Sequence, residues 1–192
     1  MIAIVKYNAG NVRSVLNALE RLGVEAVVTD DPAILKSAEK VIFPGVGEAG
    51  TAMRYLRERG LDKVLTGLTQ PFLGICLGMQ LMCSHSEEGD TPGLGIFPER
   101  VRRFPEGEKV PHMGWNELEN LKSPLMGNLP HGSDVYFVHS YFAEAGPDCI
   151  ATTTYGLPFA AAMAKQNFYG VQFHPEKSGE VGRRILGNFL SI

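Results

Sequence analysis

Along the first 80 residues, short apolar runs alternate with longer segments whose apolar residues recur at helical spacing. The short runs predict buried β-strands, and the periodic segments predict amphipathic helices. The predicted strands cover residues 2–6, 24–29, 40–43 and 72–75. The predicted helices run from Asn11 to Gly23, around Met53 to Gly60, and over residues 77–82. Strands that alternate with helices predict a parallel sheet with helices on its faces.

The second half of the chain is dominated by short strand-like runs. The predicted strands cover residues 101–104, 134–138, 149–155, 159–165 and 168–173, and residues 166–167 can form a hairpin loop. Ser178 is placed to cap a last helix. We therefore expect one α/β domain over residues 1–192. Its central sheet would be mixed, mostly parallel and flanked by helices, with an antiparallel extension of the same sheet.

Composition narrows the possible functions. The 192 residues are 44% hydrophobic and 20% charged, with a formal net charge of −3. This balance argues against binding to nucleic acid or to a membrane surface by bulk electrostatics. No apolar run reaches transmembrane length, and the N-terminus does not resemble a signal peptide. Three cysteines without metal-ligand spacing argue against a disulfide framework and a zinc site, so we expect a cytoplasmic protein.

Residues 74–78, Gly-Ile-Cys-Leu-Gly, fit the pattern of a nucleophile on a sharp turn between a buried strand and a helix. Unpaired backbone N–H groups at the start of that helix would stabilise a Cys76 thiolate, and the N–H of Leu77 would face an oxyanion. Gln80 follows one helical turn later and could present its amide to a substrate. The alternative for Cys76 is a buried structural cysteine, which carries equal weight on the pentapeptide alone. The alternative for Gln80 is a solvated glutamine.

His174 is the candidate base among five histidines, because it ends a predicted strand and Pro175-Glu176 follow it. Pro175 biases His174 toward an extended conformation, in which residues two apart point to the same side. A carboxylate beside the imidazole would hold its tautomer and stabilise the imidazolium. A turn with incidental charges explains His-Pro-Glu in isolation. Together with the cysteine turn, the triplet favours a nucleophile–base pair at the strand ends of one sheet.

Residues 44–47, Pro-Gly-Val-Gly, connect a predicted strand to a predicted helix. Two glycines let the backbone approach a ligand and turn its N–H groups inward, so this segment is a candidate oxyanion loop. It lacks the lysine and the glycine spacing of a phosphate loop. A plain strand-to-helix turn is the remaining alternative.

Together these residues resemble the class I (triad) glutamine amidotransferases over essentially the whole chain. The resemblance narrows to the glutaminase subunits of imidazole glycerol phosphate synthase through three further segments. These are Tyr-Asn-Ala-Gly-Asn at 7–11, Pro-His-Met-Gly-Trp-Asn at 111–116, and Tyr-Phe-Val-His-Ser-Tyr at 136–141. One departure is Glu-Ala-Gly at 48–50, where an apolar or aromatic residue is more familiar. It concerns the packing of the loop and leaves the triad untouched.

The resemblance implies that Cys76 attacks the side-chain amide of glutamine and forms a γ-glutamyl thioester. It implies that His174 transfers the protons and that Glu176 orients His174. Gly47 and Leu77 would supply oxyanion donors. The residues implied to hold glutamine are Gly45, Gln80, Ser140 and Tyr141. Neither a metal nor an organic cofactor is needed.

The resemblance also implies a partner, a (β/α)₈-barrel cyclase subunit that receives ammonia within a heterodimer. The cyclase would form imidazole glycerol phosphate and an aminoimidazole carboxamide ribotide in histidine biosynthesis. The residues implied for the interface and the ammonia exit are Asn8, Asn11, Trp115, Tyr136 and Lys177. On residue type alone, a core position for Trp115 carries equal weight, and Lys177 could be a solvated lysine.

Family members of this kind are nearly silent without the partner. We hypothesise that the loop at 45–47 rests with a carbonyl where an N–H is needed, and that partner binding flips the peptide. Three other functions compete with this one. The chain could serve anthranilate, aminodeoxychorismate or pyridoxal phosphate synthesis, act as a stand-alone cysteine hydrolase, or be a non-catalytic regulatory subunit.

Overall fold

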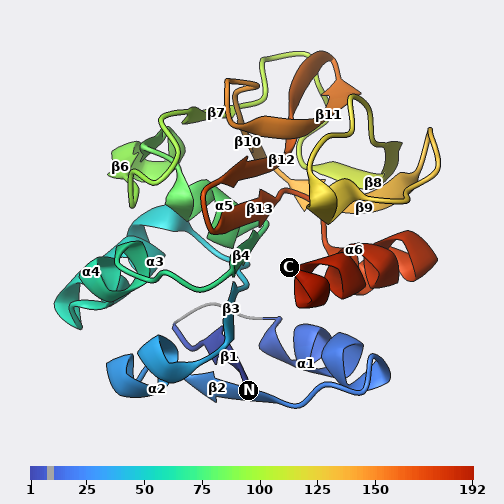
Figure 1. The fold of residues 1–192 in the computed structure, drawn as a ribbon. Helices are drawn as coiled ribbons and strands as arrows, with labels where there is room; N and C mark the ends of the chain where they lie inside the picture. Colours follow the sequence, from blue (N-terminus) through green and yellow to red (C-terminus); the bar gives the residue numbers. More distant parts are fainter. Residues whose placement is uncertain (8–10) are drawn as a thin grey trace.

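The computed structural model describes residues 1–7 and 11–192, and a seven-stranded mixed sheet forms its centre (Figure 1). The strand order is β11-β12-β13-β4-β3-β1-β2, with parallel pairing from β13 to β2 and antiparallel pairing from β11 to β13. The strands are β1 (Ile2–Val5), β2 (Ala26–Thr29), β3 (Lys40–Phe43), β4 (Phe72–Ile75), β11 (Cys149–Tyr155), β12 (Leu157–Lys165) and β13 (Phe168–Val171). The predicted α/β class with an antiparallel extension is confirmed.

Helices cover both faces of this sheet. Successive residues of a strand point to opposite faces, so each strand can pack against helices on both sides. Ile2 and Ile4 pack with α1 and α6, whereas Ala3 and Val5 pack with α2 to α5. Figure 1 shows α1 and α6 on one side of β1 to β4, and α2, α3 and α4 on the other. The helices are α1 (Val12–Arg21), α2 (Pro32–Ser37), α3 (Ala49–Glu58), α4 (Leu61–Thr66), α5 (Leu77–Met82) and α6 (Gly179–Ser191).

Two smaller sheets adjoin the central one, which corrects the prediction that all the later strands extend a single sheet. One has four strands in the order β10-β7-β5-β6, and the other is the antiparallel pair β8–β9. Their strands are β5 (His85–Ser86), β6 (Thr91–Pro92), β7 (Arg100–Arg103), β8 (His112–Glu117), β9 (Asp134–His139) and β10 (Tyr141–Ala143). The 3₁₀ turns are η1 (Glu88–Asp90), η2 (Pro124–Met126) and η3 (Pro175–Lys177).

The residue predicted to begin α1 and the predicted cap of α6 have other partners. Asn11 and Ser178 occupy the N-cap positions of α1 and α6, but neither side chain bonds to its own helix. The Ser178 hydroxyl donates to the carbonyl of His174 at 2.6 Å and accepts from the N–H of Tyr136 at 3.0 Å. Ser178 therefore ties β9 to the turn that follows β13, and the β13 strand itself ends at Val171, two residues earlier than predicted.

Gly78 allows α5 to pack against β3 at very short range. A Cβ atom at this position would lie 1.8 Å from the carbonyl oxygen of Phe43, a backbone atom. We expect Gly78→Ala to destabilise the fold by about 3 kcal/mol or more, because the backbone has to move. Urea unfolding measures this, with Gly187→Ala on α6 as the matched control.

Gly187 has no atom within 4 Å of an added Cβ. Its replacement by alanine should stabilise the fold by about 0.5–1 kcal/mol through helix propensity. Equal unfolding free energies for the two variants would contradict the packing described at Gly78.

Candidate active site

Cys76 lies on the predicted sharp turn, between the end of β4 and the start of α5. Its backbone has φ 53° and ψ −111°, a conformation that residues with a side chain rarely adopt. Glycine is required on either side of Cys76, at Gly74 and Gly78, because neighbouring backbone atoms leave no room for a Cβ. A Cβ at Gly74 would lie 2.8 Å from the backbone nitrogen of Met79, in addition to the clash described for Gly78. The strand, turn and helix around Cys76 have the bounds predicted from the sequence.

Strand β13 brings His174 to this turn. It pairs in parallel with β4, and the N–H of Cys76 donates to the carbonyl of Val171 at 2.8 Å. His174 follows three residues later, and its Nδ1 lies 2.8 Å from Oε1 of Glu176. Both side chains are 1% exposed. The pair meets through the 3₁₀ turn η3 and not through a continuous extended strand, which corrects the geometry expected from the sequence.

The electrostatics of His174 suit proton exchange with Cys76. Burial lowers the pKa of His174, but the neighbouring Cys76 and Glu176 outweigh burial and raise this pKa to about 10. Because Nδ1 faces the carboxylate, Nε2 is left for the sulfur, and it has no hydrogen-bond partner among the described residues. The buried pair with Glu176 therefore favours a protonated imidazolium at His174 at neutral pH.

Asn11 contacts the acid of this triad. Its side-chain amide donates to Oε1 of Glu176, the same oxygen that faces His174. The family resemblance implies a place for Asn11 at a partner interface, and the structure adds a contact that holds the carboxylate. Asn8, the neighbouring interface candidate, lies outside the described residues.

A cleft of about 270 Å³ opens at Cys76. Five of the predicted substrate-binding residues line it: Gly47, Leu77, Gln80, Ser140 and Tyr141. The sixth, Gly45, is not among the lining residues. An added Cβ at Gly45 would lie 2.2 Å from the Tyr7 hydroxyl, so this position is closely packed. Sequence reasoning missed the other lining residues, which are Val46, Glu88, Pro111, Val138 and His139.

Glu88 contributes a carboxylate to the residues that line this cleft. One of its oxygens accepts from the N–H of Ala49 at 2.9 Å, and burial raises its pKa. A carboxylate in this position suits an ammonium group of a substrate. Glu48, the departure noted at residues 48–50, caps α3 by accepting from the N–H groups of Gly50 and Thr51. Its acidic side chain is therefore explained by the helix and not by the cleft.

In this conformation, the candidate oxyanion loop already binds one of the two expected oxyanion donors, the N–H of Leu77. The N–H of Leu77 donates to the carbonyl of Gly45 at 3.3 Å. The hydroxyl of Tyr7 holds the preceding carbonyl, that of Pro44, at 2.6 Å. In this conformation the Leu77 N–H is engaged by a carbonyl of the protein. The peptide flip on partner binding stays a hypothesis.

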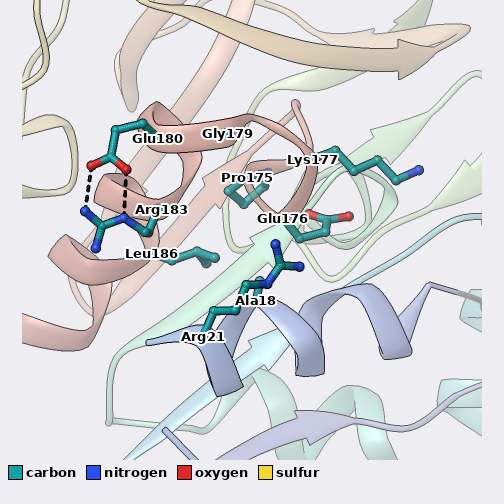
Figure 2. A pocket seen from close by; sticks show the side chains of 9 residues that line it. All are labelled: Ala18, Arg21, Pro175, Glu176, Lys177, Gly179, Glu180, Arg183 and Leu186. Carbon is teal, nitrogen blue, oxygen red and sulfur yellow. Dashed lines mark hydrogen bonds and ion pairs between the residues drawn. The ribbon is translucent and has the colours of Figure 1, made fainter. Parts of the chain in front are cut away.

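A larger hollow of about 390 Å³ lies between α1, η3 and α6 (Figure 2). Glu176 forms part of its wall, while the Lys177 side chain points away from it. The hollow is bordered by an ion pair between Glu180 and Arg183 at 2.7 Å. Neither Cys76 nor the His174 ring lines it, so we assign the chemistry to the smaller cleft.

The predicted interface residues on β8 and β9 form an exposed aromatic surface. Trp115 is 58% exposed and its neighbour on the same strand face, Met113, is 61% exposed. Trp115 pairs with Tyr136 across the two strands, with ring centroids 6.0 Å apart. The amine of Lys177 lies 6.0 Å from the centre of the Tyr136 ring. The alternative of a core position for Trp115 is therefore wrong.

Comparisons with known proteins identify the family of this chain. The family profile "Glutamine amidotransferase class-I" matches residues 3–192. Imidazole glycerol phosphate synthase subunit HisH of Bacteroides fragilis (strain YCH46) is 57% identical, covering 100% of this chain and 99% of the relative. The subunit of the same name from Methanothermobacter thermautotrophicus is 46% identical, covering 100% of this chain and 98% of the relative.

Solved structures share the fold at lower identity. A crystal structure of a glutamine amidotransferase has a TM-score of 0.77 at 22% identity, covering 100% of this chain and 98% of that one. The structure of PurLQS from Thermotoga maritima has a TM-score of 0.73 at 20% identity, covering 99% of this chain and 97% of that one. Within residues 1–7 and 11–192, no group of three or more His, Cys, Asp and Glu side chains could hold a metal ion. In the same residues, no helix has the length and apolar content to cross a membrane.

Proposed function

The chain belongs to the class-I glutamine amidotransferases, and we propose that Cys76, His174 and Glu176 hydrolyse glutamine in the glutaminase subunit of imidazole glycerol phosphate synthase. The observation that carries this proposal is the convergence of a strained cysteine turn and a buried imidazole–carboxylate pair at the carboxyl ends of β4 and β13. Parallel sheets place their sites at this edge.

In the proposed reaction, Cys76 is the nucleophile and His174 carries the protons. The Cys76 thiolate attacks the side-chain carbonyl carbon of glutamine, and the new C–S bond gives a tetrahedral oxyanion. The His174 imidazolium then gives its proton to the amide nitrogen, and the C–N bond breaks to release ammonia. Water adds to the resulting thioester while His174 takes one of its protons. Cleavage of the C–S bond frees glutamate and restores the thiolate.

Glutamine is held by groups at both ends of the cleft. The backbone around Gly47 and Leu77 lies nearest the reacting carbonyl, while Glu88 can accept from the α-ammonium group. Both N–H donors of the Gln80 amide are used within the protein. What Gln80 can offer a substrate is therefore its carbonyl oxygen.

The resting loop leads us to expect low activity in the free chain. Oxyanion stabilisation by the Leu77 N–H requires the Gly45 carbonyl to leave it, which a rotation of the peptide after Gly45 achieves. We place this rotation under control of the partner. A structure of the active complex in which the Gly45 carbonyl still accepts from the Leu77 N–H would rule it out.

The partner is a (β/α)₈-barrel cyclase bound to the exposed surface formed by Met113, Trp115, Tyr136 and Lys177. It would receive ammonia directly and form imidazole glycerol phosphate and an aminoimidazole carboxamide ribotide in histidine biosynthesis. The three free cysteines fit a reducing, cytoplasmic setting. Glutamine labelled with ¹⁵N in its side-chain amide tests the transfer. The label should enter the imidazole ring in the complex even with excess unlabelled ammonium outside. Complete dilution of the label would contradict direct transfer.

Trp115→Ala should weaken binding of the cyclase about 30-fold, because an exposed aromatic at the centre of an interface costs about 2 kcal/mol or more when truncated. Isothermal titration calorimetry measures the dissociation constant. The control is Glu58→Ala on α3, an exposed position on the other side of the sheet, which should leave binding unchanged. Equal affinity for Trp115→Ala and the wild-type chain would place the interface elsewhere.

The rival functions make different predictions. A stand-alone cysteine hydrolase should turn over its substrate without any partner. A subunit of anthranilate, aminodeoxychorismate or pyridoxal phosphate synthesis should bind the corresponding synthase instead of the barrel cyclase. A regulatory subunit should carry an inert thiol at Cys76.

A further inference from the structure

Beneath the glutamine cleft, one backbone carbonyl accepts two side-chain hydrogen bonds. The carbonyl oxygen of Tyr141 lies 2.8 Å from Nε2 of Gln80 and 2.7 Å from Nδ1 of His139. A carbonyl oxygen can only accept, so both of these nitrogens must carry hydrogen. This chemical requirement fixes the orientation of the Gln80 amide and the tautomer of a neutral His139.

The orientation of Gln80 fixes that of a second buried glutamine, Gln172. The second N–H of the Gln80 amide points at the Gln172 side chain, 2.9 Å away, so the Gln172 atom that faces it must be its oxygen. The amide nitrogen of Gln172 then faces Sγ of Cys76, at 3.6 Å. Gln172 is fully buried, and it is not among the residues that line the glutamine cleft.

The position of Gln172 follows from the sheet. It comes directly after Val171, whose carbonyl accepts from the N–H of Cys76, and two residues before His174. The strand β13 ends at Val171, and the chain bends at Gln172 and Phe173 beside the Cys76 turn. The same segment therefore brings a base and an amide donor to one sulfur atom.

We propose that Gln172 is a further catalytic residue, whose amide N–H donates to the sulfur of Cys76 and stabilises the thiolate that attacks glutamine. A hydrogen bond to an ionised acceptor is about twice as strong as one to a neutral acceptor, so this donor favours the thiolate over the thiol. When the sulfur becomes part of the thioester it is neutral again, and the bond weakens. Gln172 therefore acts mainly before and during the attack.

Two histidines keep the network in this single arrangement. Since Nδ1 of His139 carries hydrogen, its Nε2 must accept, and His112 Nδ1 donates to it at 2.9 Å. Burial lowers the pKa of His139 to about 3 and that of His112 to about 4, so both rings stay neutral at physiological pH. Gln80 is then a positioning residue for Gln172 as well as part of the cleft wall.

The test measures the reactivity of Cys76 toward iodoacetamide as a function of pH, in Gln172→Met and in the wild-type chain. Methionine keeps the size of glutamine and removes the donor. We expect alkylation about tenfold slower at neutral pH, with the midpoint of its pH dependence raised by about one unit. The Cys76→Ala chain gives the background from the other two cysteines.

Gln70→Met is the matched control, because the Gln70 amide also donates to a carbonyl, that of Leu35, away from Cys76. It should leave rate and midpoint unchanged. A folded Gln172→Met chain with the wild-type midpoint would overturn the proposal, including when its rate is lower, because removal of a donor that stabilises the thiolate must raise the midpoint. Thermal unfolding establishes that each variant is folded.

If Gln172→Met does not fold, Gln172→Glu keeps the shape and places a carboxylate beside the sulfur, and its midpoint should rise at least as far. If neither folds, the side-chain amide signals of Gln172 in the wild-type chain decide by nuclear magnetic resonance. They should titrate with the alkylation midpoint of Cys76, and signals that do not titrate would overturn the proposal.

The inference rests on Cys76 being the nucleophile of the proposed function, yet its readout needs neither glutamine nor the cyclase. A shifted midpoint in a chain that never hydrolyses glutamine would leave the donor to Cys76 in place and reject only the proposed function.

Discussion

Replacing Cys76 by alanine should lower the turnover of glutamine in the complex by at least about 10⁴-fold, because no other group can form the thioester. The reason is geometric. Cys76 alone among the three cysteines lies on a strained turn beside an imidazole, in the wall of the cleft. Glutamate release, coupled to an indicator enzyme, measures the effect.

Cys149→Ala is the matched control for this experiment. Cys149 lies on β11, partly exposed, and burial raises its pKa, which makes it a poor nucleophile. Its removal should leave turnover within about twofold of the wild-type value. Residual activity in Cys76→Ala comparable to that of Cys149→Ala would reject a covalent mechanism through Cys76.

Replacing His174 by asparagine should lower turnover about 10³-fold, within the range that general acid–base catalysis supplies. Asparagine can still donate a hydrogen bond to Glu176, but it offers nothing in place of Nε2. The raised pKa of His174 means that the ring carries the proton destined for ammonia at neutral pH. The variant should therefore lose the proton donor, and its Cys76 should also be alkylated more slowly.

The exposed His131 provides the control for that substitution. His131→Asn should retain wild-type turnover, since its side chain lies outside the cleft. If His174→Asn kept more than about a tenth of the wild-type rate, a role for His174 as the general acid and base would be untenable.

The nucleophile could be predicted from the sequence alone, because the features that indicate it lie close together in the chain. A buried strand, a cysteine between glycines and a following helix lie within eleven residues, 72–82, and the structure reproduces their bounds. Helix α2 was missed although its signal was also local. Asp31 caps it by accepting from the N–H of Ala33, and Pro32 occupies its first turn.

The strand β8 was missed for a different physical reason. Its pattern is inverted, with polar His112 buried and apolar Met113 and Trp115 exposed. Periodicity rules assume that apolar residues face the core, and an interaction surface violates that assumption. The inversion fits the surface proposed above for the cyclase, and it can be recognised only once the strand pairing is known.

The other contacts of the site could not be predicted, because they join residues that are far apart in the sequence. Gln172 contacts Cys76 across 96 positions, and Gln80 contacts Gln172 across 92. Asn11 reaches Glu176 across 165. No sequence motif predicts these contacts, because each of these residue types is common in the kind of segment where it lies. They follow from the register of β4 beside β13 and from the position of α1 beside η3.

The most direct test of the account is the rate of glutamate release from glutamine by the purified chain, alone and with the barrel cyclase and its nucleotide ligand. The account predicts a nearly silent free chain, because the Gly45 carbonyl occupies the Leu77 N–H, and strong activation in the complex that Cys76→Ala abolishes. Equal rates with and without the cyclase, or silence in a confirmed complex, would contradict it.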